Sequence, residues 1–397
     1  MSKLDFSTVI NRRGTDSYKW DAADREVGNT ETIQMGCADM DFKSPPEIIE
    51  ELHKVVEHGI FGYATLTQQY APGIVSWYKE RHNCELKAEW ILYVPRIVVA
   101  CSVLVNTFTQ KGDKVILNSP YYPPLNDVTS GCYREVICPA LVEKDGRYVM
   151  DLEALEKQID ASTKLMILVS PHNPTTRIWT REELQAIADF CVKHDLLLFV
   201  DEIHSDFAAK GQTFISMADI QGPIQDRLVV VNAPAKSFNV MGCAMSYLIV
   251  PNAEVRKRLE KALDAAGETD ANDFGNAVMR VAYQKCGYYV DEVNAYIDDN
   301  DAYLRAELPK LFPQVVVKPR EGTYLLWVDF TKVFPNEEVL HDFFTNKAKV
   351  NVLMGSHFGP NFDGFVRINM GCPRATLEEV MRRLTSAWQQ CQSSVQN

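Results

Sequence analysis

Short β-rich runs alternate with helical stretches through the middle of the chain, and no other feature of the sequence constrains the fold as much. The β-rich runs fall at residues 115–117, 165–169, 196–200, 228–231 and 247–250. Between two of them, residues 181–194 carry an apolar stripe at helical spacing, and Thr180 precedes this stretch as an expected N-cap. Strands that alternate with helices predict an α/β fold, in which a mostly parallel sheet is covered by helices on both faces.

The pattern changes after Pro251, where longer helical stretches replace the regular alternation. Helices are predicted at residues 255–263, 290–311, 337–347 and 375–389, and strands at residues 324–330, 350–353 and 365–369. This order predicts a second, smaller α+β domain. We expect an N-terminal arm with part of the small domain at residues 1–47, a large domain at residues 48–289, and the rest of the small domain at residues 290–397.

The composition argues against several classes of partner. The 397 residues carry 41 basic and 53 acidic side chains, so the net charge of -12 disfavours binding to nucleic acids or to anionic membranes. The longest mainly apolar stretch, residues 97–105, is far too short to span a membrane, and the N-terminus lacks an apolar segment of signal-peptide length. Ten cysteines are scattered without a C-x-x-C pair, which predicts reduced thiols and no metal site. A cytoplasmic protein is expected.

Polar side chains with distinct chemistry stand where the predicted strands end. Tyr122, Asn173, Asp201 and Lys236 each follow one of the β-rich runs, and ligands of open α/β sheets bind outside the carboxyl ends of the strands. A lysine amine condenses with an aldehyde, a carboxylate stabilises a protonated pyridine by about 1 to 3 pKa units, an amide donates to a phenolic oxygen, and an aromatic ring stacks on a flat one. Together they predict a site for pyridoxal 5′-phosphate. Spacing alone does not decide whether Tyr121 or Tyr122 supplies the ring.

Taken singly, each residue has a plainer interpretation. A lone lysine such as Lys236 is usually a solvated loop cation, Asp201 is more often a turn cap, and Asn173 belongs to an Asn-Pro turn. His204, three residues after Asp201, is expected to support that carboxylate with a hydrogen bond, the alternative being a packed or exposed histidine. The prediction of a cofactor site therefore rests on the combination of these residues.

The phosphate of such a cofactor needs N–H donors. The sequence contains neither G-x-x-x-x-G-K-[ST] nor G-x-G-x-x-G, so it lacks the usual glycine-rich phosphate loops. Residues 95–105 have the pattern of a loop that enters a helix, and the free N–H groups of Arg96, Ile97 and Val98 are the candidate phosphate donors.

Segments that match one enzyme family are spread over nearly the whole chain. They are KWD at residues 19–21, ADMDF at 38–42, FGY at 61–63, SPHNP at 170–174, DEIH at 201–204, AKSFN at 235–239 and FVRIN at 365–369. Each is a modest signal, but in this order they are highly specific. The chain resembles the fold type I pyridoxal-phosphate enzymes, and within them the cystathionine β-lyase or C–S lyase branch, the MalY/PatB family, close to cystalysin.

The resemblance implies a role for each residue around the cofactor. Lys236 bonds covalently to the cofactor and then acts as the catalytic base, and Asp201 pairs with the ring nitrogen. Asn173 contacts the ring oxygen and the substrate, and Tyr122 stacks on the ring and takes part in catalysis. The expected cofactor site of the large domain is completed by His204, Ile97 and Val98.

The resemblance also implies how the substrate is held and where a second subunit enters. Arg367 grips the carboxylate of an amino acid with its planar pair of donors, assisted by the backbone near Cys37. A homodimer is expected, in which Tyr63 reaches the cofactor phosphate of the partner subunit. The implied reaction is β-elimination on L-cystathionine or a related L-cysteine S-conjugate, which releases a thiol, pyruvate and ammonia. The alternatives are a class I or II aminotransferase, or a regulatory protein that retains the site.

A few positions depart from the family pattern. Ala233 and Ala244 stand where relatives carry a phosphate-binding hydroxyl or arginine, so the phosphate anchor must differ. Arg96 replaces a small residue, and we expect it to neutralise part of the phosphate charge or to shape the substrate entrance. Thr176 replaces the glycine usual in the loop after the Asn-Pro step, which affects the loop geometry rather than the chemistry.

Overall fold

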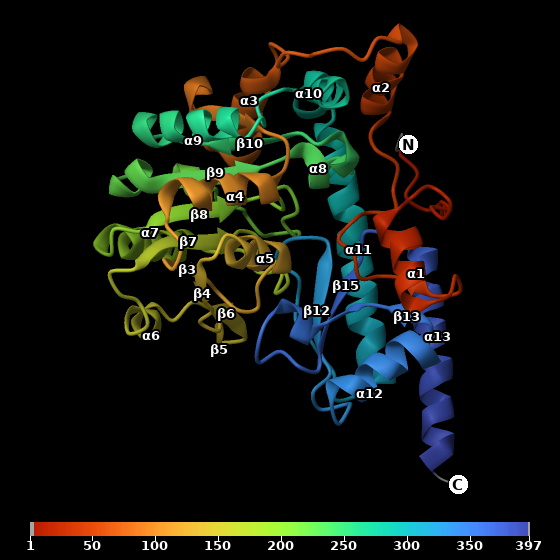
Figure 1. Ribbon diagram of the computed structural model, residues 1–397. Coiled ribbons are helices and arrows are strands. Elements are labelled where there is room, and N and C mark those ends of the chain that lie inside the picture. Colours follow the sequence, from red (N-terminus) through yellow and green to blue (C-terminus); the bar gives the residue numbers. More distant parts are fainter. Residues whose placement is uncertain (1–3, 396–397) are drawn as a thin grey trace.

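The computed structural model describes residues 4–395, and Figure 1 shows a larger and a smaller sheet with the long helix α11 (Gly287–Leu311) beside them. The larger sheet has seven strands and the smaller one has four. Helix α11 passes from the side of α10 to the side of α12 and so runs along both sheets, which is the course expected for the predicted helix at residues 290–311.

The seven-stranded sheet has the order β2, β10, β9, β8, β7, β3, β4. The bounds of its strands are β2 (Ile91–Val94), β3 (Lys114–Leu117), β4 (Glu135–Ile137), β7 (Thr163–Val169), β8 (Leu197–Asp201), β9 (Leu228–Asn232) and β10 (Ser246–Ile249). Strands β9, β8, β7, β3 and β4 are parallel, and β10 is antiparallel to both β9 and β2. The prediction of a mostly parallel sheet is confirmed.

Helices cover both faces of this sheet. The covering helices are α3 (Tyr70–His82), α7 (Arg181–Lys193) and α10 (Asp273–Lys285) on one face, and α4 (Ile97–Phe108), α5 (Pro123–Gly131) and α9 (Ala253–Ala265) on the other. In β9, Val230 packs with the first group and Val231 with the second, and the whole strand is buried. Burial on both faces explains why the strands read as continuous apolar runs. No helix within residues 4–395 combines the length and the apolar character that a bilayer crossing requires.

The four-stranded sheet is antiparallel and has the order β11, β12, β15, β14. The remaining elements around it are β11 (Val316–Val317), β12 (Leu325–Asp329), α12 (Glu337–Asp342), β14 (Leu353–Met354), β15 (Phe365–Asn369) and α13 (Arg374–Val395). Near the N-terminus, a π-helical turn (Tyr18–Ala22) and α1 (Ala23–Val27) precede β1 (Ile33–Gln34). Strand β1 pairs in parallel with β13 (Val350–Asn351), so the N-terminal arm joins the C-terminal part of the chain before α2 (Pro46–His58) leads away.

Some predicted elements differ from the structure. The predicted strand at residues 350–353 is wrong as a single strand, because β13 pairs with β1 while β14 pairs with β15. The predicted helix at residues 337–347 continues beyond α12 only as a π-helical turn (Phe343–Lys347). Helix α10 is missing from the prediction, although it is amphipathic and Asn272 caps its N-terminus by accepting from the N–H of Gly275.

Candidate active site

The carboxyl ends of the parallel strands open onto a cavity of about 210 Å³. Asp201 is the last residue of β8, and Lys236 lies on the short helix α8 (Pro234–Ser237) directly after β9. Asn173 follows β7, and Tyr122 precedes α5. The predicted cofactor residues that line this cavity together are Lys236, Asp201, Asn173, Tyr122, His204, Ile97 and Val98.

A wider groove of about 860 Å³ lies elsewhere, between the N-terminal arm and α13. Exposed cations such as Lys347 and Arg382 line it, and none of the strand-end residues reaches it. Size therefore does not identify the reactive site here; the chemistry of the lining side chains does.

Lys236 is half-buried, and its Nζ donates a hydrogen bond to the carbonyl of Ala38. Burial lowers the pKa of Lys236 below its ordinary value, because removal from water disfavours the ammonium form. Arg367 lowers this pKa further, whereas Asp39 and Asp201 oppose the shift. A lysine of lowered pKa presents more neutral amine, the form that attacks an aldehyde or accepts a proton.

Asp201 is 2% exposed, and its Oδ1 accepts the N–H of Ile203 at 3.0 Å. Burial raises the pKa of Asp201 to about 6, and nearby Lys236 partly counteracts this rise. A carboxylate in such a setting is stabilised by a cation placed against it. A protonated ring nitrogen is a cation of this kind.

The predicted hydrogen bond from His204 to Asp201 is absent among the described residues. The Nδ1 of His204 is buried without a partner there, and its ring packs edge-on against Tyr324 with the centroids 5.4 Å apart. Burial lowers the pKa of His204 well below the ordinary value, so the ring is neutral. The alternative of a packed histidine describes this residue, which leaves a polar atom at the wall of the cavity.

Arg367 is a buried guanidinium on β15, 3% exposed. Its Nη1 donates to Oδ1 of Asn173 at 2.9 Å and its Nη2 to the carbonyl of Gly36 at 2.7 Å. No carboxylate among residues 4–395 forms an ion pair with it, and its Nε has no partner there. Burial lowers the pKa of Arg367 to about 10. A buried cation is costly without a counter-charge, so this group is suited to a carboxylate ligand.

The structure separates the two adjacent tyrosines. Tyr122 lines the cavity, whereas Tyr121 donates its backbone N–H to the carbonyl of Phe358 at 2.8 Å and does not line it. Burial raises the pKa of Tyr122 to about 12, which keeps the phenol neutral. The ring of Tyr63 is fully exposed and lies outside the cavity of its own chain. Cys37 is half-buried, and burial raises the pKa of its thiol.

Helix α4 begins at the opposite end of the cavity. Its N-cap residue Arg96 makes no side-chain capping bond, so the first N–H groups of the helix, at Ile97 and Val98, are free for an acceptor. Ala244 also lines this end, and buried Ala233 offers no hydroxyl. An amine, a buried acid, an aromatic ring and a helix N-terminus thus surround one cavity, and this donor set fits pyridoxal 5′-phosphate.

Thr176, the residue that departs from the family's glycine, lies in the loop after the Asn-Pro step. It adopts a φ of 63°, a left-handed conformation that glycine takes freely and that strains a β-branched residue. Its N–H donates to the carbonyl of His172 at 2.7 Å, and its carbonyl accepts from Gly322 at 2.6 Å. The loop around Asn173 is therefore held by backbone hydrogen bonds on both sides.

Sequence reasoning missed the groups that hold the backbone over the cavity. Tyr324 donates its hydroxyl to the carbonyl of Ala38 at 2.8 Å, and Asn369 donates to the carbonyls of Cys37 and Asp39 at 2.7 and 2.9 Å. One signal was available, because Asn369 is two residues after Arg367 and so projects from the same face of the strand.

The fold and the site define a class: α/β enzymes that act on amino acids through a lysine-bound aldehyde cofactor. The family model for aminotransferase class I and II matches residues 30–384. Cystathionine beta-lyase PatB of Bacillus subtilis is 36% identical over 97% of this chain and 100% of its own length. The chain belongs to the aminotransferase class I and II family.

Solved structures agree with this assignment over the whole fold. Cystalysin from Treponema denticola, which contains pyridoxal 5′-phosphate, is 33% identical with a TM-score of 0.94, covering 98% of this chain and 99% of its own. A PLP-bound putative aminotransferase from Clostridium difficile 630 is 35% identical with a TM-score of 0.94, covering 97% of this chain and 100% of its own.

Proposed function

We propose that this chain is a pyridoxal-phosphate-dependent carbon–sulfur lyase. It acts on L-cystathionine or related L-cysteine S-conjugates by β-elimination, and releases a thiol, pyruvate and ammonia. The main evidence for an amino-acid substrate is the buried guanidinium of Arg367, which has no carboxylate partner in the described chain. This guanidinium donates to Asn173, which lines the cavity. The similarity to cystathionine beta-lyase PatB supports elimination at sulfur as the reaction.

The cofactor and the protein side chains have separate roles in the reaction. When bound, pyridoxal 5′-phosphate supplies an electron sink that stabilises negative charge at the substrate Cα. Asp201 holds a proton on the ring nitrogen, and its burial strengthens that interaction because the local dielectric is low. Tyr122 would stack on the ring, and the amide of Asn173 would donate to the ring oxygen.

The substrate is oriented by the guanidinium and deprotonated by the amine. Arg367 binds the α-carboxylate through parallel N–H donors, which fixes the direction of the Cα–H bond. Lys236 accepts the Cα proton on Nζ, since its lowered pKa favours the neutral amine. Loss of the thiolate from Cβ, which takes up a proton to become the thiol, completes the elimination, and water hydrolyses the released enamine to pyruvate and ammonia.

The start of α4 is our proposed phosphate site. The N–H groups of Ile97 and Val98 donate to the phosphate oxygens, aided by the positive end of the helix dipole. The guanidinium of Arg96 has no hydrogen-bond or ion-pair partner among residues 4–395, and Arg96 lines the cavity, so its charge is available to the phosphate.

We propose that two copies of the chain form a homodimer next to the cavity. Exposed apolar side chains gather there: Ile60 and Tyr63 are 70% and 103% exposed, and the rings of Phe61 and Phe274 stack with centroids 6.1 Å apart. Asn272, two residues before Phe274, donates to the carbonyl of Ala244 at the cavity wall. An apolar surface in this place suits a second copy, whose own Tyr63 then reaches the phosphate.

The thiols support a cytoplasmic location. All ten cysteines are unpaired, as is usual in a reducing compartment. We place the enzyme there, acting on a small-molecule amino acid.

Replacement of Lys236 by Ala tests the function. The variant should lose the visible absorbance of the bound cofactor and should release pyruvate and thiol from cystathionine about 100- to 10,000-fold more slowly, the range that loss of a general base produces. Lys114→Ala is the matched control, since that lysine pairs with Asp160 far from the cavity. Wild-type turnover in Lys236→Ala would exclude the proposed role.

The same assay separates the rival functions. Amino-group transfer from the substrate to an oxo acid, without thiol release, would identify an aminotransferase. A purified wild-type protein without a bound chromophore would instead favour a regulatory protein.

A further inference from the structure

A short backbone segment between β1 and α2 crosses the site, and we call residues 36–42 the strap. Side chains from distant parts of the chain donate to almost every carbonyl along it. The donors are Arg367 to Gly36, Asn369 to Cys37, Tyr324 and Lys236 to Ala38, Asn369 and Lys19 to Asp39, Arg12 and Asn239 to Met40, and Asn239 to Phe42. The strap therefore contacts both the catalytic amine and the carboxylate-binding guanidinium through its own backbone.

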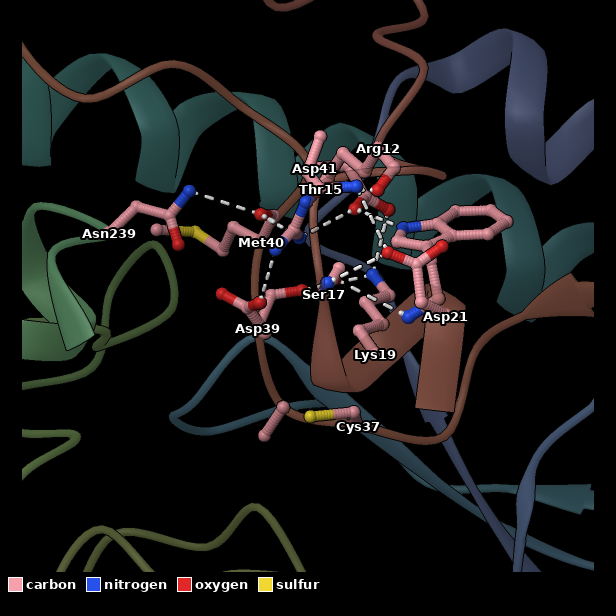
Figure 2. Close-up of polar contacts among 12 residues, drawn as sticks. Arg12, Thr15, Ser17, Lys19, Asp21, Cys37, Asp39, Met40, Asp41 and Asn239 are labelled. Carbon is pink, nitrogen blue, oxygen red and sulfur yellow. Dashed lines mark hydrogen bonds and ion pairs between the residues drawn. The ribbon is translucent and has the colours of Figure 1, made fainter. Parts of the chain in front are cut away.

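The N-terminal arm holds the strap by a buried ion pair, which Figure 2 shows. The Nζ of Lys19 donates to the carbonyl of Asp39 at 2.9 Å and pairs with Oδ2 of Asp41 at 2.7 Å. The other oxygen of Asp41 accepts from Nε1 of Trp20 and from Nη1 of Arg12, each at 3.0 Å. Lys19 thus contacts two residues of the strap, Asp39 and Asp41, at once.

A contribution to the stability of the fold does not explain the buried ion pair of Lys19 and Asp41 well. The side chain of Lys19 is 0% exposed and that of Asp41 is 6% exposed, so both charges have lost nearly all their water. Desolvation offsets much of the attraction of a buried ion pair, and apolar residues of similar volume often serve stability equally well. Bonds from Lys19 to a carbonyl and to a carboxylate are directional, so they fix the position of the backbone, which apolar packing does not.

We propose that Lys19 is a positioning residue: it fixes the strap, and thereby the Ala38 carbonyl against Lys236 and the Gly36 carbonyl against Arg367. This inference rests on the proposed function, because it assigns those two side chains to the base and to the carboxylate. Lys19 touches neither substrate nor cofactor, and it acts through the backbone of residues 36–42.

Lys19→Met tests the inference, with Arg13→Met as the matched control. Arg13 belongs to the same arm and makes a comparable pair, with Nε 2.6 Å from Oδ2 of Asp24 and Nη2 2.8 Å from the carbonyl of Thr32, but it does not contact the strap. Both variants are to be loaded with cofactor and checked for an intact fold by circular dichroism. Lys19→Met should lower kcat/KM by about 100-fold, the effect of misplacing reacting groups by about 1 Å, whereas Arg13→Met should affect stability alone.

A second readout needs no substrate. The pH midpoint of the visible absorbance of the lysine-bound cofactor reports the charges around Lys236, which are Cys37 and Asp39 on the strap, Arg367 on β15 and Asp201 on β8. In Lys19→Met this midpoint should shift to lower pH, because the Ala38 carbonyl and the Asp39 carboxylate, which favour the protonated form, are displaced. In Arg13→Met it should not move.

A double variant guards against misfolding. Lys19→Met leaves the buried Asp41 with only Arg12 and Trp20 as partners, and the loss of one of its two cations can unfold the protein. Lys19→Met/Asp41→Leu removes both charges and should show the same kinetic and spectral changes in a stable fold. Wild-type kcat/KM and midpoint in either folded variant would overturn the inference. If the wild type released no thiol or pyruvate, the proposed reaction would fail while the spectral midpoint still decided the role of Lys19.

Discussion

Burial is the largest influence on the pKa values of Lys236, Arg367 and Asp201. It lowers the pKa of Lys236, lowers that of Arg367 to about 10 and raises that of Asp201 to about 6. In each case the charged form is disfavoured until an opposite charge lies against it. The site is therefore matched to a ligand that brings a carboxylate, a basic ring nitrogen and a carbonyl carbon to defined places.

Arg96→Ala should weaken cofactor binding without abolishing it. An exposed cation contributes modestly to a phosphate site, so the dissociation constant should rise by about two- to fivefold. The effect should shrink at high salt, which screens exposed charges. Absorbance titration of the apoprotein at low and high ionic strength measures both quantities.

Arg258→Ala is the control for Arg96→Ala, because Arg258 donates to the carbonyl of Thr107 at the other end of α4. Equal dissociation constants in the two variants, together with unchanged substrate kinetics, would reject a role for Arg96 in the phosphate site and at the entrance.

The sequence was informative about side chains that act from strand ends and uninformative about backbone groups. Lys236, Asp201 and Asn173 could be placed at one cavity because parallel strands share a carboxyl edge. The role of Ala38 depends on a carbonyl, which any residue type provides. His204 could not be assigned between its two alternatives, because its ring packs against Tyr324, just before β12, and no local spacing encodes that contact.

At the scale of elements, the end of β8 is fastened by a second acid. Glu202 is fully buried directly after Asp201, and it accepts from the backbone N–H of Met217 at 2.7 Å and from the hydroxyl of Ser216 at 2.8 Å. Burial raises the pKa of Glu202 to about 8. The protonated form therefore predominates at neutral pH, and this side chain ties the strand that carries Asp201 to the 3₁₀ helix at Met217–Asp219.

The free energy of unfolding should fall as the pH rises from 4.5 towards 8 because of Glu202. The pKa of this acid is higher in the folded state than in the unfolded state, so the folded state binds more protons in that range and loses stability with rising pH. Above pH 6, Asp201 adds little to the slope, since its own folded-state pKa is about 6.

Glu202→Gln should flatten this slope. Urea unfolding of the apoprotein at several pH values between 6 and 8 checks it. Parallel wild-type and variant curves would show that Glu202 ionises alike in both states.

Element prediction succeeded where burial imposes a simple pattern. The parallel strands are buried on both faces and give continuous apolar runs, and α7 has one apolar stripe and a capping box at Thr180. The short strands β13 and β14 lack such patterns, because each has only two residues, and β13 pairs with β1 from the other end of the chain.

At the scale of the whole molecule, the proposed dimer depends on the exposed apolar surface near the cavity. Phe61→Asp should weaken self-association, since it places a charge in the exposed apolar surface near the cavity. Sedimentation at decreasing concentration should show monomers at concentrations where the wild type is dimeric, and cofactor should be lost in parallel.

Val339→Asp is the control for Phe61→Asp, because Val339 is 38% exposed on α12, far from α10 in Figure 1. A monomeric wild type that retains its cofactor would refute the shared site. The boundaries at residues 47 and 289 stay predictions, although α11 begins within a few residues of the second one.

Hydrogen bonds from elements of both sheets meet on the strap. Its carbonyls accept hydrogen bonds from Lys236 next to the larger sheet, from Arg367 and Asn369 in the smaller one, and from Lys19 in the arm. The two sheets and the arm therefore hold the same few peptide units, so a shift of either sheet would alter both the contact of Ala38 with Lys236 and the contact of Gly36 with Arg367.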